Sequence, residues 1–273
     1  MASALPTYFL SHGGGPWPFM KEQYGSTYDV LEASLADIPR QIGTKPKAVL
    51  VVSGHWEERE FTLSSSEAPG MIYDYGGFPS HTYQVKYPAP GCPEVAARAA
   101  ILLAEAGFSA GLDPNRGFDH GTFSMLYPVY PHADIPVVQM SLLHGFDPLA
   151  HLNAGRALAP LRSEGVLIIG SGLSYHNLQQ FGPGGRLASH KFDDWLGFTL
   201  LDLPPTQRTS SLLHWDQAPY ARMAHPREEH LMPLLVAYGA AEHEAAARVY
   251  HEDEFFGNLA VSSFRFGQAA QGS

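Results

Sequence analysis

The sequence predicts one α/β domain, spanning residues 1–273, in which a mostly parallel or mixed central sheet carries helices on both faces. Three observations lead to this prediction. Short apolar runs alternate along the chain with longer helical patterns. Apolar residues make up 45% of the chain and charged residues only 16%, which suits one large core. No stretch has the composition of a linker between domains.

Four short runs rich in Val, Ile, Leu and Phe are expected to form the buried strands of this sheet. Each is too short for a helix and apolar throughout, as expected of a strand that is covered on both faces. They are residues 7–10, 48–52, 136–142 and 166–169. Two later segments, residues 246–250 and 259–266, are expected to add antiparallel strands at an edge.

Three longer segments carry helical start and stop signals, with proline or a capping residue near the start and glycine near the end. They are residues 93–106, 147–163 and 226–238, with Gly107, Gly165 and Gly239 as stop signals. Three other segments fit no regular element and are expected to be long loops, a kind of segment that usually carries function. These are residues 68–91, 114–121 and 182–187.

Charge and cysteine content exclude several classes of function. The net charge is -10 and the sequence pI is near 5.7, so the chain lacks the basic surface that nucleic acid or an anionic membrane requires. The single cysteine, Cys92, allows neither an internal disulfide nor a cysteine-based metal site. With no basic signal-peptide start and no apolar run of membrane-spanning length, we expect a cytoplasmic monomer or homodimer.

Histidine is unusually frequent, with 14 residues against 17 Lys and Arg. Ligands of open α/β sheets bind beyond the carboxyl ends of the strands, so histidines that follow apolar runs are candidates for one shared site. His12, His55 and His176 follow three predicted strands, each beside Gly or Ser. His230 lies in the early turns of the predicted late helix, and His120 lies at a predicted helix start.

Neutral imidazoles with open coordination positions suit Fe(II), Zn(II) or Cu(II), and ligand type alone does not separate these metals. The other nine histidines have no such placement. They are expected at the surface or in structural positions, with His81 and His225 as the strongest exceptions.

Eight short motifs follow one another from about residue 7 to about residue 267. They are residues 11–13, 51–56, 73–79, 87–91, 117–121, 133–139, 171–178 and 229–235. As an ordered set, these motifs resemble the class III extradiol ring-cleavage dioxygenases of the LigB superfamily, in the branch that contains DOPA 4,5-dioxygenase. One departure is the loop after His12, where this chain has three glycines before Pro16 and many relatives read His-Gly-Ser-Pro.

The resemblance implies that His12, His55 and His230 bind a non-haem metal. The metal would be Fe(II) for activity, with Zn(II) expected in purified or crystallised protein. His176 is implied as the catalytic acid or base, and as a candidate fourth ligand in the resting state. His120 is implied as the second active-site histidine, in contact with oxygen or substrate.

Under this hypothesis the partners are a small aromatic diol and O2, and the product is a ring-opened semialdehyde. His176 would take the proton of one catechol hydroxyl and later return it, and His120 would stabilise negative charge on oxygen. The tyrosine-rich loop, including Tyr75, is expected to cover the flat substrate. Arg116 is a candidate partner for a substrate carboxylate.

Two alternatives use the same histidines. The first is a zinc-dependent hydrolase, and the second is a catalytically inactive binding protein of this fold. The presence of both His120 and His176 argues against the second, because a purely structural site needs neither. A serine hydrolase is weaker, since the sequence around Ser171 lacks the Gly-x-Ser-x-Gly spacing of a nucleophile elbow.

Overall fold

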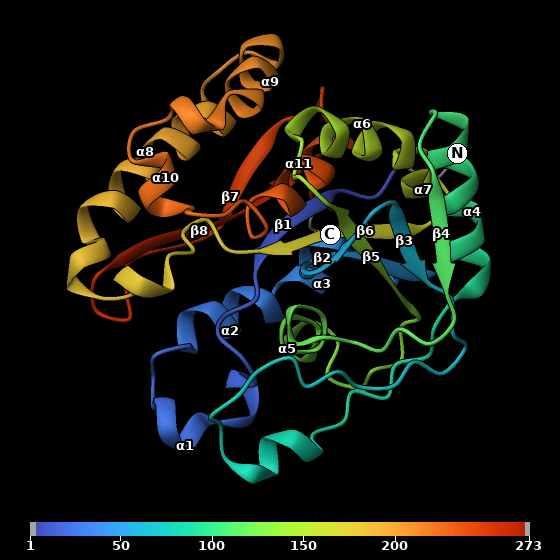
Figure 1. Cartoon of the computed structure of the whole chain (residues 1–273), viewed down its shortest axis with the longest axis horizontal. Coiled ribbons are helices and arrows are strands. Elements are labelled where there is room, and N and C mark those ends of the chain that lie inside the picture. The colour runs from blue at the N-terminus through green and yellow to red at the C-terminus, as the bar shows by residue number, and fades with distance from the viewer. Residues whose placement is uncertain (1–3, 271–273) are drawn as a thin grey trace.

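The computed structural model describes residues 4–270, and its centre is one mixed eight-stranded sheet (Figure 1). The strand order across the sheet is β4-β3-β5-β2-β6-β1-β8-β7. The strands are β1 Thr7–Ser11, β2 Ala48–Glu58, β3 Phe61–Ser64, β4 Ala110–Asp113, β5 Val137–Leu143, β6 Val166–Gly172, β7 Ala246–Phe255 and β8 Leu259–Phe266. The predicted α/β class with a mixed sheet is therefore confirmed.

The four apolar runs form the parallel middle of this sheet, in the order β5-β2-β6-β1. Every residue of β1 and β6 is buried, which explains why these strands are apolar without alternation. Ser11 of β1 pairs with Gly172 of β6, and Ser53 of β2 pairs with Ser171. The ends of β1 and β6 thus lie level with Ser53 of β2, so the residues that follow these three positions meet at one edge of the sheet.

The remaining strands lie at the two sides of this middle. On one side β8 runs antiparallel to β1 and β7 runs antiparallel to β8, as predicted for the tail. On the other side β3 runs antiparallel to β5 and parallel to β4. Strands β3 and β4 were not predicted, because a strand of four residues is too short to show an alternating apolar pattern.

Helices cover both faces of the sheet, with α6 and α11 on one side of the central strands and α5 on the other (Figure 1). The helices are α1 Lys21–Tyr24, α2 Asp29–Ala36, α3 Ile38–Ile42, α4 Pro93–Glu105, α5 His120–Val129, α6 Pro148–Leu158, α7 Pro160–Ser163, α8 Arg186–Leu201, α9 Pro205–Leu213, α10 Ala221–Ala224 and α11 Met232–Gly239. Short 3-10 turns span Trp17–Phe19, Ser80–Gln84, Leu178–Gln180, Pro183–Gly185 and Trp215–Gln217. None of the helices within residues 4–270 is long and apolar enough to cross a membrane.

Three predicted boundaries are corrected by the structure. The helix expected over residues 147–163 is two helices, because Pro160 has no N–H to continue α6. The late helix begins at Met232 instead of Pro226, since Pro233 is tolerated only in a first turn. His230 therefore precedes this helix. The loop expected over residues 182–187 is shorter, because α8 begins at Arg186.

Candidate metal centre

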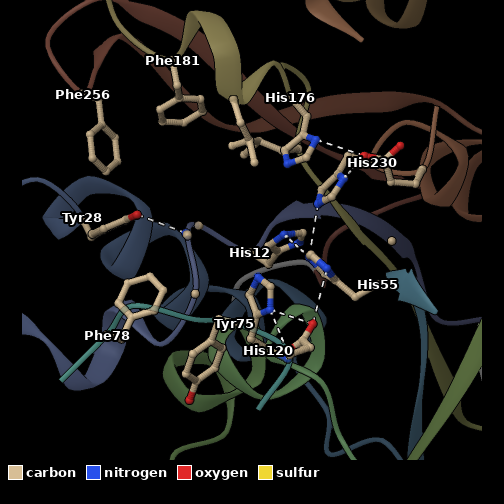
Figure 2. A pocket seen from close by; sticks show the side chains of 18 of the residues that line it. His12, Tyr28, His55, Tyr75, Phe78, His120, His176, Phe181, His230 and Phe256 are labelled. Carbon is tan, nitrogen blue, oxygen red and sulfur yellow. Dashed lines mark hydrogen bonds and ion pairs between the residues drawn. The ribbon is translucent and has the colours of Figure 1, made fainter. Parts of the chain in front are cut away.

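The five histidines singled out in the sequence line one cavity of about 610 Å³ at the carboxyl end of the central strands (Figure 2). His12 directly follows β1, His55 lies near the end of β2, and His176 follows β6. His120 is the first residue of α5, and His230 lies two residues before α11. The structure therefore brings together every histidine that was predicted for the shared site.

An irregularity in β2 places His55 at the cavity. The pairing of β2 with β5 shifts register between Val52 and Glu57, as in a β-bulge, and such bulges re-aim side chains beside active sites. The absence of a side chain at Gly121 makes room for the ring, because a Cβ there would lie 2.9 Å from His55 Cδ2. Similarly, a Cβ on Gly172 would collide with the carbonyl oxygen of His230, which accepts a hydrogen bond from the Leu173 amide.

Three imidazoles approach one another with their Nε2 atoms. His55 Nε2 lies 3.1 Å from His12 Nε2 and 3.2 Å from His230 Nε2. The other two rings flank this trio: the ring of His176 stacks on that of His230 at a centroid distance of 3.4 Å, and the ring of His120 lies 4.0 Å from that of His55. Figure 2 shows all five rings gathered on one side of the cavity.

Two carboxylates hold the opposite nitrogens of four of these rings. Asp74 lies 2.9 Å from His120 Nδ1 and 3.4 Å from His55 Nδ1. Glu229 lies 3.2 Å from His176 Nδ1 and 3.1 Å from His230 Nδ1. A carboxylate only accepts hydrogen bonds, so Nδ1 of His120, His176 and His230 carries the proton and Nε2 presents its lone pair. The longer contact of Asp74 with His55 Nδ1 favours the same tautomer for His55.

His12 reaches the same tautomer through a serine. The Ser171 hydroxyl donates a short hydrogen bond to the Gly121 carbonyl, and its oxygen lies 3.2 Å from His12 Nδ1. Because the single hydroxyl proton is already used, the serine oxygen accepts from Nδ1–H. The indole of Trp17 donates to the His12 carbonyl at 2.7 Å and fixes the backbone there.

Burial keeps the rings of His12, His55 and His230 neutral. It is the main cause that lowers the pKa of His55 to about 3, followed by the charge of His120. Burial and the neighbouring histidines also hold the pKa values of His12 and His230 well below the usual range. Burial alone would raise the pKa of Asp74 and that of Glu229, but hydrogen bonds to His120 and His176 lower both. Neutral nitrogens backed by two anions suit a divalent cation.

The distances also fit a shared ion. Two nitrogen ligands about 2.1 Å from one ion lie about 3.0–3.4 Å apart for bond angles between about 90° and 109°. The two Nε2 separations fall in this range. Lone pairs facing each other so closely repel unless a cation lies among them, and the low pKa values disfavour a proton in that place. Two other sets of side chains also bring possible metal ligands within 4.8 Å of one another. They are His12, His55 and His120, and His176, Glu229 and His230.

Of these sets, the trio His12, His55 and His230 is the proposed ligand set, because Nε2 of His12 and Nε2 of His230 both approach Nε2 of His55. Glu229 instead contacts the Nδ1 atoms of His176 and His230.

Residues 6–264 match the family model described as the catalytic LigB subunit of aromatic ring-opening dioxygenase. The chain belongs to the LigB family. It is thus an enzyme of the ring-cleaving dioxygenase type, as the resemblance implied.

Relatives of this LigB-family chain carry related names. It is 39% identical over 266 residues to a protein of Portulaca grandiflora named 4,5-DOPA dioxygenase extradiol, with 95% of both chains covered. It is 37% identical over 271 residues to the dioxygenase tasH of Hapsidospora irregularis, covering 92% of this chain and 82% of that one. A crystal structure of an uncharacterized protein from Escherichia coli K12 superposes with a TM-score of 0.76 at 30% identity, over 96% of this chain and 100% of that one.

The sequence also predicts substrate contacts for Tyr75 and Arg116. Tyr75 lines the cavity with its ring, 5.9 Å from that of His120, while its hydroxyl donates to the Thr82 carbonyl. Arg116 does not line the cavity. It pairs with the buried Asp119 at 2.8 Å and lies over the Trp56 ring, so this geometry gives no support to the expected contact with a substrate carboxylate.

Sequence reasoning missed three carboxylates of the LigB-family site. Asp74 lies in an irregular loop, and Glu229 stands directly before the proposed ligand His230. Asp119 caps α5 by accepting from the Thr122 amide, and it also binds Ser53 and Gln139, which ties the helix that carries His120 to β2 and β5. The signal that was available for Asp119 is its place directly before a helix start, where aspartate is a preferred cap.

Proposed function

We propose that this LigB-family enzyme is an Fe(II)-dependent extradiol dioxygenase that cleaves a catechol-type ring beside its diol, with both atoms of O2 entering a ring-opened semialdehyde product. His12, His55 and His230 are the proposed ligands. The observation that carries this proposal is that His12 and His230 each bring Nε2 within 3.2 Å of His55 Nε2, with two further imidazoles beside this trio. A structural metal site would need only the trio.

Fe(II) at this place would supply a Lewis-acidic centre that holds the two catechol oxygens and O2 side by side. The protein residues around it have the complementary task of moving protons and orienting the ring. All five imidazoles line the same cavity, so each ring is within reach of a group bound there.

His176 is the proposed proton carrier. Its Nδ1–H is held by Glu229, so Nε2 can accept the proton of a catechol hydroxyl, and the carboxylate stabilises the imidazolium that forms. The same nitrogen can return the proton when the ring opens. Stacking of His176 on His230 keeps the ring in place, and its closeness to the trio is consistent with a fourth-ligand role in the resting state.

His120 is the proposed stabiliser of negative charge on oxygen. Asp74 accepts hydrogen bonds from both the backbone N–H and Nδ1 of His120, so the ring has one fixed orientation at the cavity wall. When Nε2 also carries a proton, the ring presents a fixed N–H donor to the cavity, and such a donor stabilises charge on oxygen without having to reorganise. The ring of Tyr75 closes the wall beside it.

The test is to remove metal with a chelator, restore Fe(II) or Zn(II) without oxygen, and then offer catechols with O2. We expect the Fe(II) form to consume one O2 per catechol and to yield a yellow product. We expect the Zn(II) form to bind metal without consuming O2. Turnover of ester or amide substrates by the Zn(II) form, with no O2 uptake by the Fe(II) form, would instead support a hydrolase.

A further inference from the structure

The side of the cavity that faces the histidines is built almost entirely of apolar side chains. Figure 2 shows Tyr28, Phe78, Phe181 and Phe256 across the cavity from the imidazoles, and Leu178 also lines it. The ring centroid of Phe256 lies 5.3 Å from that of Phe181 and 5.5 Å from that of Tyr28. These three rings form an aromatic wall beyond the place where a diol would bind.

The charged groups of the cavity are already committed. Among the described residues that line it, Arg227 is the only one with a permanent positive charge, and it makes two 2.6 Å hydrogen bonds to the Glu57 carboxylate. Its guanidinium also lies over the Phe146 ring. Asp74 and Glu229 are held by histidines. A carboxylate on the substrate would find no free cation here and would face these anions.

Phe256 supports a binding role for the wall independently. It lies in the turn between β7 and β8 with φ 50, a left-handed backbone conformation in which Asn, Asp or Gly is usual and an aromatic residue is an outlier. It is 37% exposed, and Leu178, which lines the same cavity, is also exposed, so both side chains lie where the cavity opens to solvent. Strain of this kind persists at ligand clamps, where the side chain serves a purpose other than the turn.

The cavity is also larger than one catechol ring requires. Its volume of about 610 Å³ lies in the range of about 300–1,000 Å³ that is typical of pockets for drug-sized ligands. With the diol end fixed by the histidines, the remaining volume lies against the aromatic wall. A substituent on the ring would fill this volume.

We infer that the preferred substrate is a catechol with an uncharged, apolar alkyl or aryl substituent, which packs against Tyr28, Phe181 and Phe256. This inference rests on the proposed function. It separates this chain from an enzyme selective for DOPA, whose side chain carries an ammonium and a carboxylate. Burial of apolar substituent surface against the wall favours the apolar catechol, and unpaired burial of a carboxylate disfavours the charged one.

The test compares kcat/KM for O2 uptake with catechol, butylcatechol, dihydroxyphenylpropionate and L-DOPA on the Fe(II)-loaded enzyme. We expect butylcatechol to exceed both charged substrates by at least about tenfold. Equal or better use of dihydroxyphenylpropionate or L-DOPA would overturn the substrate class while leaving the dioxygenase intact. O2 uptake with none of the four compounds would instead count against the proposed function.

The Phe256→Asn variant tests the wall without disrupting the turn, because Asn tolerates the left-handed conformation. We expect its preference for butylcatechol over catechol to fall by at least about fivefold. The matched control is Phe198→Asn on α8, where the parent ring is 55% exposed and outside the cavity, and the parent preference should remain. An unchanged preference in Phe256→Asn would contradict the inference.

The Leu178→Arg variant adds the missing cation at an exposed position, so the fold should tolerate it. We expect it to raise kcat/KM for dihydroxyphenylpropionate by about fivefold or more relative to butylcatechol. No change in that ratio would show that charge at the mouth does not decide selectivity.

Discussion

Two groups of buried or half-buried histidines differ in what their ring nitrogens do. The pocket group is the set of five that line the cavity, and the isolated group consists of His151 and His225. Burial lowers the pKa of His151 to about 4 and that of His225 to about 3, much as it does for His55. Low pKa and burial alone therefore do not distinguish a site from a packed core residue.

The distinction lies in the partners. His151 uses both nitrogens on the main chain: Nε2 accepts from the Leu143 amide at 3.2 Å, and Nδ1 donates to the Asp147 carbonyl at 2.8 Å. His225 donates from Nε2 to the Ser174 carbonyl, and its ring packs near Phe192 and Trp215. In the pocket group, protein oxygens hold Nδ1 and leave Nε2 facing a cavity. A free nitrogen in a cavity is what makes a ligand.

Loss of His55 should give the largest effect, because its Nε2 links the other two proposed ligands. We expect His55→Ala to lose bound iron and to reduce kcat/KM by at least about a thousandfold, which corresponds to the several kcal/mol that a metal contributes. Metal analysis and O2 uptake measure both. The surface variant His132→Ala is the control and should keep iron and activity. One equivalent of tightly bound iron in His55→Ala would show that His55 is not a required metal ligand.

Loss of His176 separates proton transfer from metal binding within the pocket group. We expect His176→Gln to retain iron and to reduce kcat by about 10²–10⁴-fold, the usual contribution of a general acid or base. Iron content and single-turnover kinetics check this pair of outcomes. Wild-type kcat in this variant would remove the proposed role, and loss of iron would make His176 an essential ligand.

The two carboxylates should matter less than the rings that they hold. We expect Asp74→Asn and Glu229→Gln each to reduce iron affinity or activity by about 10–100-fold, because a neutral amide no longer stabilises the Nδ1–H of two histidines. Exposed Glu22→Gln is a matched control of the same charge change. Iron titration with a competing chelator measures affinity. Parent behaviour in both variants would show that the rings are fixed by packing alone.

The sequence predicted those pocket residues that directly follow apolar strand patterns. His12, His55 and His176 follow apolar runs, and parallel pairing places the ends of such runs at one edge, so their convergence followed from strand order. The pattern did not reveal Asp74, since an irregular loop has no period that fixes its position. It misplaced the start of the helix after His230, because Pro226 and Pro233 both read as start signals and only tertiary packing decides between them.

The smallest effect on chemistry, and the sharpest test of the comparison, is expected at His151. Its folded pKa of about 4 lies below the usual value of about 6.5, so the unfolded chain binds more protons between these values. The stability that His151 contributes is therefore full above about pH 6.5 and is lost as the pH falls toward 4. The pKa difference corresponds to about 3 kcal/mol of unfolding free energy.

The His151→Gln variant should flatten this part of the pH profile, because glutamine cannot take up the proton in the unfolded chain. Urea unfolding of parent and variant at several pH values, with chelator present, measures the difference. At pH 7.5 we expect the variant to be less stable by about 1–3 kcal/mol, through its poorer hydrogen bonds to the main chain. Its iron content and O2 uptake should stay within about twofold of the parent. Parallel pH profiles would contradict the lowered pKa of His151, and loss of iron would place this histidine with the pocket group.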